Sequence, residues 1–249
     1  MTRAALVTGG ANRIGLAVAS ALAADGWRVA IHFGRSAAAA EEAAASLSAA
    51  NCTVVTLSAD LSLEEEASAL VDHAAAALGA PLNCLVNNAA VFDRDTVETA
   101  TRETWNHHMD VNLRAAFILT QCFARALPPG AEGNVVNMLD QRVWSLTSEF
   151  VTYTLSKSAL WTLTRTMALA LAPRIRVNGV GPGPVLPSAR QAESHFATQA
   201  AATPLGRPVE IADVVATVRF LIATPSITGQ MIAVDSGQHL SAPRGEDSE

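Results

Sequence analysis

Short apolar runs alternate with longer alanine-rich stretches along most of the chain. The runs are nearly continuous in apolar character, which is typical of strands buried on both faces of a parallel sheet. Their length and their β-branched residues separate them from the stretches between, which have the composition of helices. We therefore expect strands at 4–8, 27–33, 52–60, 81–90, 134–139, 175–184 and 231–235.

Helical stretches follow these strands in turn. Right-handed crossovers between parallel strands then lead to an α/β doubly wound Rossmann-type fold, with a parallel seven-stranded sheet and helices on both faces. Because no composition shift marks a boundary, we expect a single domain over 1–240 and a polar C-terminal tail over 241–249. We expect the first helix to end near Asp25. The other expected helices span about 37–50, 63–78, 101–127 with a bend near Asn112, 151–172, 188–201 and 210–223.

Composition excludes several classes of function. The chain has 249 residues, 50% of them hydrophobic, and a net charge of −6, and it has no basic stripe of the kind that binds nucleic acid. No apolar run reaches the roughly 20 residues that span a membrane. The histidines are scattered or adjacent, so we expect no metal site. An odd number of widely spaced cysteines suits a reducing cytoplasm; they are Cys52, Cys84 and Cys122.

The chain contains one tyrosine and one lysine, and they stand four residues apart as Tyr153 and Lys157. Every other Lys or Arg position is Arg. Residues four apart share one face of a helix. An ammonium near a phenol favours the phenolate and lowers its pKa from about 10, which would make Tyr153 a usable acid and base near neutrality. We interpret the pair as catalytic rather than as a coincidence on an ordinary helix surface.

The glycine-rich turn TGGANRIG (8–15) joins the first strand to the first helix. Gly9 suits a tight turn, and Gly15 lets helix and sheet approach closely. The helix start at Arg13 and Ile14 then presents N–H groups and a positive dipole end to a pyrophosphate. The turn predicts a dinucleotide site, because it directly follows a strand at the start of the chain.

The end of the second strand favours NADP over NAD. An NAD site usually has an acidic residue there for the ribose 2′-hydroxyl, and AIHFGRS has none. It offers His32, Arg35 and Ser36 instead, and we expect Arg13 to converge on them around a 2′-phosphate. Asp60, with Leu61 beside it, follows the third strand and suits either the adenine amine or a helix N-cap.

Taken in order, the motifs resemble those of the short-chain dehydrogenase/reductase family over nearly the whole chain. They are TGGANRIG, NNAA (87–90), Asn112 in DVNLRAAF, the Y-x-x-x-K of 153–157, RVNGVGPG (176–183) and VDSG (234–237). The resemblance implies hydride transfer at a nicotinamide, with Tyr153 as proton donor, Lys157 as its partner and Asn112 as a water-holding relay. It also implies a homotetramer, and cofactor contacts from Asn88, Ala89, Pro182 and Gly183.

Asp140 departs from that pattern, because family members usually carry serine there. A protonated Asp140 can donate to a ring nitrogen, and an ionised one can accept from amino groups, so either state suits a nitrogen heterocycle. The combination of Asp140 with Arg13, HFGRS and Phe92 resembles that of pteridine reductases and of dihydropteridine reductases of the dihydromonapterin type. In such enzymes an aromatic ring at the position of Phe92 stacks on the pterin. We therefore expect an NADPH-dependent reductase that acts on a C=N or C=O bond, with Phe92, Asp140 and Tyr153 against the substrate.

Two alternatives stay open at this point. One is a reductase or dehydrogenase of an unidentified carbonyl or alcohol, in which Asp140 serves another substrate. The other is a non-catalytic nucleotide-sensing protein on the same fold, which the loss of the usual serine favours and the intact Tyr153, Lys157 and Asn112 oppose. The segment 184–207, polar and rich in proline, suits a lid over the substrate.

Overall fold

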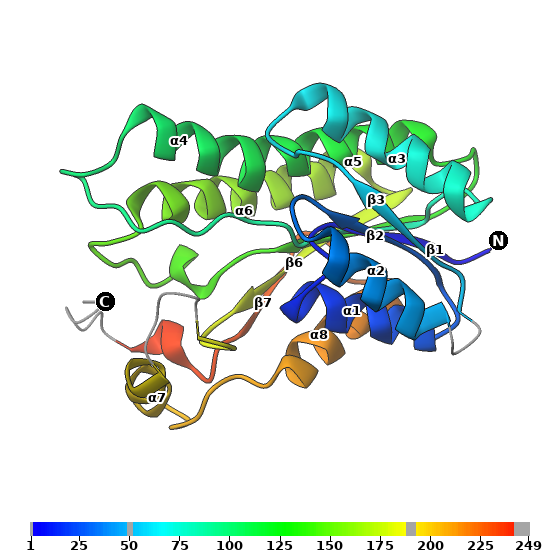
Figure 1. The fold of residues 1–249 in the computed structure, drawn as a ribbon. Helices are drawn as coiled ribbons and strands as arrows, with labels where there is room; N and C mark the ends of the chain where they lie inside the picture. The colour runs from blue at the N-terminus through cyan, green and yellow to red at the C-terminus, as the bar shows by residue number, and fades with distance from the viewer. Residues whose placement is uncertain (1, 49–51, 188–192, 242–249) are drawn as a thin grey trace.

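A computed structural model describes residues 2–48, 52–187 and 193–241. Seven strands form one parallel sheet in the order β3-β2-β1-β4-β5-β6-β7 (Figure 1). The expected seven-stranded doubly wound sheet is thus confirmed. The strands are β1 (Ala4–Val7), β2 (Arg28–Phe33), β3 (Val54–Ser58), β4 (Cys84–Asn87), β5 (Gly133–Met138), β6 (Ile175–Pro182) and β7 (Met231–Val234).

Helices cover both faces of the sheet (Figure 1). One face carries α1 (Arg13–Ala24), α2 (Ala37–Ser48) and α8 (Ile211–Ala223), and the other carries α3 (Glu64–Leu78), α5 (Ala115–Ala126) and α6 (Val151–Leu171). Two shorter helices, α4 (Arg102–His108) and α7 (Glu193–Ala201), lie toward the end of the molecule that holds the carboxyl ends of the strands.

The first strand shows why the apolar runs are continuous. Side chains alternate between the two faces of a strand. Ala4 and Leu6 therefore pack in the core beneath α3 and α5, whereas Ala5 and Val7 pack in the core beneath α1 and α8. All four are fully buried. A strand covered on both faces needs apolar residues at every position, so no alternating pattern appears.

The expected bent helix over 101–127 consists of three pieces. Helix α4 begins after Thr101, whose hydroxyl accepts the N–H of Thr104 in a capping box. A π-helical turn, η1 (Met109–Arg114), interrupts the regular helix around Asn112, and α5 follows. The parts of our expectations that fall on residues 49–51, 188–192 and 242–249, including nearly all of the polar tail, lie outside the described residues.

Arginines on the strand side cap the C-terminal ends of three helices. Arg28 lies in β2, Arg174 directly precedes β6, and Arg176 lies in β6. Each guanidinium donates to last-turn carbonyl oxygens, which have no partner within their own helix. A forked donor reaches two carbonyls at once. The bonds, each of 2.8 Å, run to Leu78 of α3, to Leu127 after α5 and to Leu221 and Ile222 of α8.

The described part of the chain has neither a membrane-spanning helix nor a cluster of metal ligands. None of its helices is long and apolar enough to cross a membrane. No group of three or more His, Cys, Asp or Glu side chains within those ranges is arranged to hold a metal ion.

Candidate active site

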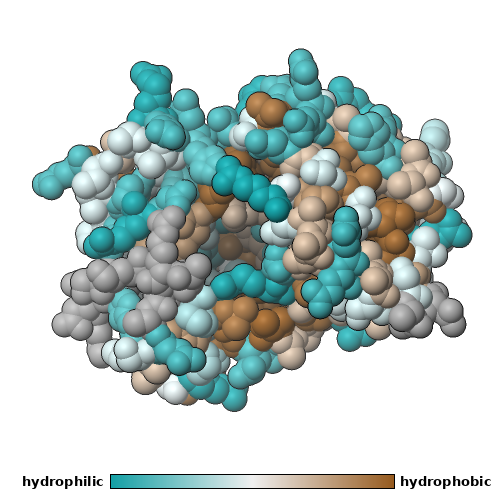
Figure 2. Space-filling model, in the orientation of Figure 1, coloured by the Kyte–Doolittle hydropathy of each residue, from teal (hydrophilic) through white to brown (hydrophobic). Residues whose placement is uncertain are grey.

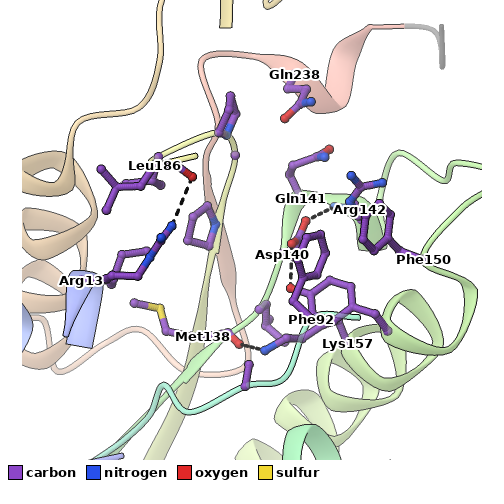
Figure 3. Close-up of a pocket in the computed structure, with 18 of the residues that line it drawn as sticks. Arg13, Phe92, Met138, Asp140, Gln141, Arg142, Phe150, Lys157, Leu186 and Gln238 are labelled. Carbon is purple, nitrogen blue, oxygen red and sulfur yellow. Dashed lines mark hydrogen bonds between the residues drawn. The ribbon is translucent and has the colours of Figure 1, made fainter. Parts of the chain in front are cut away.

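Helix α6 brings Tyr153 and Lys157 to the carboxyl end of β5. Both side chains are buried and share one face of the helix. Tyr153 Oη donates a hydrogen bond of 2.8 Å to Asp140 Oδ2. Lys157 Nζ donates one of 2.8 Å to the carbonyl oxygen of Met138 (Figure 3). The phenol, the ammonium and the carboxylate that stand out in the sequence therefore meet at one place.

Burial governs the ionisation of this pair. It raises the pKa of Tyr153 well above the ordinary value, and the Asp140 carboxylate raises it further, against an opposing effect of Arg142. Burial also lowers the pKa of Lys157 to about 8, which Asp140 partly opposes. Our expectation that Lys157 lowers the pKa of Tyr153 is not met in this structure, because Nζ bonds to Met138 and lies 5.7 Å from the centre of the phenol ring. Tyr153 is a neutral donor here.

Asp140 uses both of its carboxylate oxygens. Oδ1 accepts the backbone N–H of Arg142 at 2.8 Å, which starts the 3-10 turn η2 (Gln141–Val143), and Oδ2 accepts the phenolic hydrogen of Tyr153. A carboxylate at the end of a buried strand thus caps the next turn and orients the phenol. A proton on this Tyr153–Asp140 pair lies where it can be passed to a bound molecule.

Asn112 is buried in the π-helical turn η1. Its Oδ1 accepts the N–H of Val91 at 2.8 Å, and its Nδ2 donates to Val91 O at 3.0 Å and to Ser156 Oγ at 3.1 Å. π-Helical turns inside helices occur frequently at functional sites. The side chain joins the loop after β4 to α6, and its role in holding a relay water stays a prediction.

The glycine turn after β1 has no room for side chains. Gly9 has a φ of +60°, and a Cβ added at Gly15 would lie 2.2 Å from Gly9 O and 2.5 Å from Asn88 Nδ2. Asn88 Nδ2 donates to the carbonyl oxygens of Thr8 at 2.9 Å and of Gly9 at 3.1 Å. Ala89 approaches this turn from the same side, 3.0 Å from the Cβ position of Gly9. The NNAA segment therefore braces the glycine turn.

Helix α1 starts directly after this turn at Arg13. The preceding residue, Asn12, makes no side-chain capping bond, and the first turn of the helix carries no acidic residue. The N–H groups at this helix start keep their capacity to bind an anion, which the helix dipole favours.

His32 has a different role from the one expected. It is buried; Nδ1 accepts the N–H of Gly9 at 3.1 Å, and Nε2 pairs with Ala59 O at 3.0 Å. A backbone N–H can only donate, so the ring is neutral with its hydrogen on Nε2. Burial lowers the pKa of His32 and favours this neutral form. The expected direct contact with a 2′-phosphate is corrected: the ring supports the glycine turn from behind.

Arg13 is also directed elsewhere. Its backbone has a φ of +52°, and its guanidinium donates to Pro187 O at 3.0 Å. It also donates to Leu186 O at 3.2 Å (Figure 3). It therefore joins the glycine turn to the segment after β6. The expected convergence of Arg13 with Arg35 and Ser36 is not met in this structure.

Arg35 and Ser36 are exposed beyond β2, where a ligand can reach them. Asp60 is exposed after β3, and its Oδ1 accepts from Ser62 N at 2.9 Å and Ser62 Oγ at 2.7 Å. The hydrogen bonds from Ser62 lower the pKa of Asp60, and Arg35 adds to this. Because α3 begins at Glu64, Asp60 closes a turn rather than capping that helix.

A cavity of about 510 Å³ lies at the carboxyl ends of the strands. The molecular face in Figure 2 is hollowed near its centre, with an apolar floor and hydrophilic groups at the rim. Such a volume lies within the range of small-molecule sites. The expected substrate and catalytic residues Phe92, Asp140, Tyr153 and Lys157 line the cavity, and so do Arg13, Ile14, Asn88, Pro182 and Gly183. Leu61, Ala89 and Asn112 line a separate small void.

Phe92 reaches the cavity from the loop after β4. Its ring stacks parallel on Phe150 with 4.3 Å between centroids, and Tyr153 meets it edge-on at 4.6 Å. The Arg142 guanidinium lies 4.9 Å from the centre of the Phe150 ring. One face of Phe92 is thus occupied, while the side chain remains 40% exposed. Stacking of Phe92 on a ligand stays a prediction.

Among the cavity residues that sequence reasoning missed are Gln141, Arg142 and Phe150. Gln141 and Arg142 are buried and directly follow Asp140 in NMLDQRV, so their place after the strand was a usable signal. Phe150 adopts a φ of +56° before α6, which no local pattern announces. Among the described residues, Gln141 Oε1 is a buried acceptor without a hydrogen-bond partner.

Comparison with known proteins places this geometry in a family. A family model described as enoyl-(acyl carrier protein) reductase matches residues 9–239. FolM alternative dihydrofolate reductase 1 from Brucella canis, solved with NADP, is 44% identical, with a TM-score of 0.94 over 99% of this chain and 97% of that one. L-xylulose reductase of Bos taurus is 36% identical over 94% of this chain and 96% of its own length. Pteridine reductase 1 of Leishmania tarentolae is 33% identical over 95% and 96%. The chain belongs to the short-chain dehydrogenase/reductase family of oxidoreductases.

Proposed function

We propose that this protein is an NADPH-dependent reductase of a dihydropteridine or dihydrofolate. The observation that carries the proposal is the 2.8 Å hydrogen bond from Tyr153 to Asp140 in the cavity above β5. A ketone needs one proton donor, whereas a pterin ring also presents nitrogen donors and acceptors that a carboxylate can recognise. The relatives named as FolM alternative dihydrofolate reductase 1 and pteridine reductase 1 support the same substrate class.

The residues present fit a nicotinamide dinucleotide. The glycine turn leaves backbone room for a pyrophosphate, and the start of α1 offers N–H groups without a competing acid. Arg35 and Ser36 suit the 2′-phosphate, since the end of β2 carries no carboxylate. Lys157 Nζ has donors beyond the one bonded to Met138 for ribose hydroxyls. When bound, the cofactor supplies a hydride.

The proton side of the reaction falls to the chain itself. Reduction of a C=N bond adds a hydride to carbon and a proton to nitrogen. Tyr153 Oη holds a proton against Asp140 Oδ2, so the pair can pass it to a ring nitrogen. Loss of that proton leaves a second negative charge on the Tyr153–Asp140 pair, and Lys157, whose pKa of about 8 keeps it mostly protonated at pH 7, offsets part of this charge.

Gln141 adds a second argument for an amino-substituted ring. Its Oε1 is buried in the cavity wall and has no partner among the described residues. A buried acceptor without a partner is unfavourable. With the side chain turned toward the cavity, Oε1 would accept from an amino group of a ligand, whereas a plain ketone has no hydrogen to donate.

The test is a substrate panel with purified protein. NADPH oxidation is followed with dihydrobiopterin, dihydromonapterin, dihydrofolate, quinones, ketones and sugars. We expect the pteridines and dihydrofolate to be reduced. Turnover of ketones or sugars alone would identify a carbonyl reductase, and no turnover would favour a nucleotide-sensing protein. NADH run in parallel tests the cofactor preference, and Arg35→Asp is expected to weaken NADPH binding.

Asp140→Ser tests the role of the carboxylate. Serine restores the usual family residue, and we expect it to lower kcat/KM for the pteridines by about 10²-fold or more, the scale of a lost acid–base group. NADPH binding should stay unchanged, which shows that the fold is intact. Pteridine reduction that survives this substitution unchanged would overturn the assignment.

We further propose that the protein works in the cytoplasm as a homotetramer. Exposed apolar side chains on α5 and α6 support the assembly, because they suit burial against other copies; they are Phe117, Leu155 and Leu169. Light scattering on the purified protein measures the subunit number directly, and a monomer across the working concentration range would contradict the proposal.

A further inference from the structure

Three buried polar side chains form a hydrogen-bonded chain next to Tyr153, and none of them lines the cavity. Thr152 Oγ1 donates to Asp95 Oδ2, and His108 Nδ1 lies 2.7 Å from Thr152 Oγ1. No more than 2% of any of the three residues is exposed. Buried polar groups are costly unless satisfied, so a complete chain of this kind is a specific structural device.

The direction of each hydrogen bond follows from one backbone group. His108 Nε2 lies 3.1 Å from the N–H of Asp93, which can only donate, so Nε2 accepts. In the neutral ring the hydrogen is then on Nδ1 and is donated to Thr152 Oγ1. The Thr152 hydroxyl in turn donates its hydrogen bond to Asp95 Oδ2. A neutral His108 satisfies every group in the chain.

Asp95 caps the helix that carries the catalytic pair. Its Oδ1 accepts the N–H of Thr152 at 3.1 Å, and its backbone oxygen accepts the N–H of Phe150 at 2.8 Å. The residue before the helix, Phe150, makes no side-chain capping bond and has a left-handed φ of +56°. A carboxylate from the loop after β4 therefore replaces the local cap and stabilises the helix start through its dipole.

The hydrogen-bonded chain adjoins residues of the cavity at two points. Asp93, which bonds His108, directly follows Phe92. Thr152 directly precedes Tyr153, and the His108 ring packs edge-on against the Tyr153 ring with 5.9 Å between centroids. The chain thus sets the loop with Phe92 and the helix with Tyr153 at a fixed separation.

We propose that Asp95, Thr152 and His108 are positioning residues for the reduction. They hold Tyr153 against Asp140 and hold Phe92 at the substrate side of the cavity, and they do so only while His108 is neutral. The inference rests on the proposed roles of Tyr153 and Phe92.

A proton on His108 would break the chain at a defined bond. It would place an N–H of Nε2 against the N–H of Asp93, two donors facing each other. Burial lowers the pKa of His108 from 6.5, Asp95 and Asp93 oppose this, and His107 adds to it. Tyr153 faces the ring from α6 as a neutral phenol. Because the folded pKa lies below 6.5, the alignment is still present at pH 6.5 and is lost as the pH falls through that lower pKa.

One matched pair of substitutions separates positioning from general packing. Thr152→Val keeps the branched shape but removes the hydroxyl that joins Asp95 to His108. Thr152→Ser restores that hydroxyl. Thr154→Val is the control, because Thr154 Oγ1 is also buried on α6 yet has no hydrogen-bond partner among the described residues.

Each variant is measured by steady-state reduction of dihydrobiopterin, by NADPH titration and by NMR of the ¹³C-labelled tyrosine ring. The chain has one tyrosine, so the NMR signal reports on Tyr153 alone. We expect Thr152→Val to lower kcat/KM about tenfold, equivalent to about 1.4 kcal/mol, and to shift the tyrosine resonance. NADPH affinity should stay unchanged, Thr152→Ser should restore the wild-type values, and Thr154→Val should match wild type.

Thr152→Val that matches Thr154→Val in both rate and resonance would overturn the proposal. Should Thr152→Val fail to fold, Thr152→Ser and His108→Gln carry the test. The glutamine side chain of His108→Gln can accept from the N–H of Asp93 but does not titrate. The KM of this variant should therefore stay constant below pH 6.5, where the wild-type KM rises. An identical pH profile in both proteins would refute the proposed dependence on neutral His108.

Failure of the proposed function is distinguishable from failure of this inference. If wild type reduces no pteridine, the function is wrong. The tyrosine resonance still shows whether Thr152 and His108 set the position of Tyr153, because that signal needs no substrate.

Discussion

Replacing Lys157 by methionine is expected to stabilise the fold at pH 7 while it abolishes turnover. Lys157 is buried, and its pKa falls from 10.5 to about 8, chiefly through burial. At about 1.4 kcal/mol per pH unit, the charged amine costs the folded state about 3 kcal/mol at neutral pH. Loss of the hydrogen bond to Met138 O offsets about 1 kcal/mol of this gain. Lys157→Met should therefore gain about 2 kcal/mol, because methionine fills similar space.

The sign of the pH dependence follows from the same two values. Below about pH 8 both folded and unfolded chains carry the proton, and the cost is complete. Between about 8 and 10.5 the folded protein releases the proton while the unfolded chain keeps it, so wild type gains stability relative to the variant. The advantage of Lys157→Met should fall by about 2 kcal/mol between roughly pH 7 and pH 9.5.

Urea unfolding followed by tryptophan fluorescence measures these differences. All proteins are compared at one concentration, because association changes apparent stability. Lys157→Arg is the control: it cannot lose its charge, so its stability relative to wild type should fall as the pH rises from about 8 to 10.5, where wild-type Lys157 becomes neutral. A methionine variant that is less stable than wild type at pH 7, or whose difference does not change with pH, would refute the reasoning.

Three further changes have expected outcomes. Gly15→Ala should weaken NADPH binding about tenfold or more in a fluorescence titration, because its Cβ would lie 2.2 Å from a backbone oxygen, whereas Gly34→Ala, with no contact nearer than 3.9 Å, should bind as wild type. Leu85→Ala, fully buried in β4, should lower the free energy of unfolding by about 2–5 kcal/mol, and a loss below about 1 kcal/mol would contradict its packing. Arg219→Met, which removes the exposed ion pair with Asp25, should cost at most about 1 kcal/mol, and urea unfolding in 1 M salt should abolish the difference.

The fold was predictable because its main signal is local. A strand covered on both faces must be apolar at every position, as Leu6 and Val7 show. Seven such runs in the sequence predicted the seven strands of the sheet. The π-helical turn around Asn112 was predicted only as a bend. In this turn the Asn112 side chain forms hydrogen bonds with Val91 and Ser156, which lie 21 and 44 residues away. No pattern along the helix predicts these bonds.

The site was predictable where a residue stood out by rarity or place. Tyr153, Lys157 and Asp140 met as expected, because the carboxyl end of β5 and the start of α6 adjoin in this topology. Arg13 was misjudged, since its positive φ and the carbonyls of the segment after β6 direct the guanidinium. Asp95 was overlooked, because its partner Thr152 is 57 residues away.

The single buried lysine has a consequence for how the proposed tetramer can be studied. The one lysine, Lys157, is 3% exposed and lies at the cavity wall, so no lysine amine stands on the outer surface, which carries guanidinium and imidazole groups instead. Bifunctional esters that join lysines would not cross-link the side chains of neighbouring subunits in a tetramer. The treated protein would then run as single subunits on a denaturing gel. Chemistry directed at carboxyl groups, of which the chain has 23 on Asp and Glu side chains, is the suitable way to trap neighbouring copies.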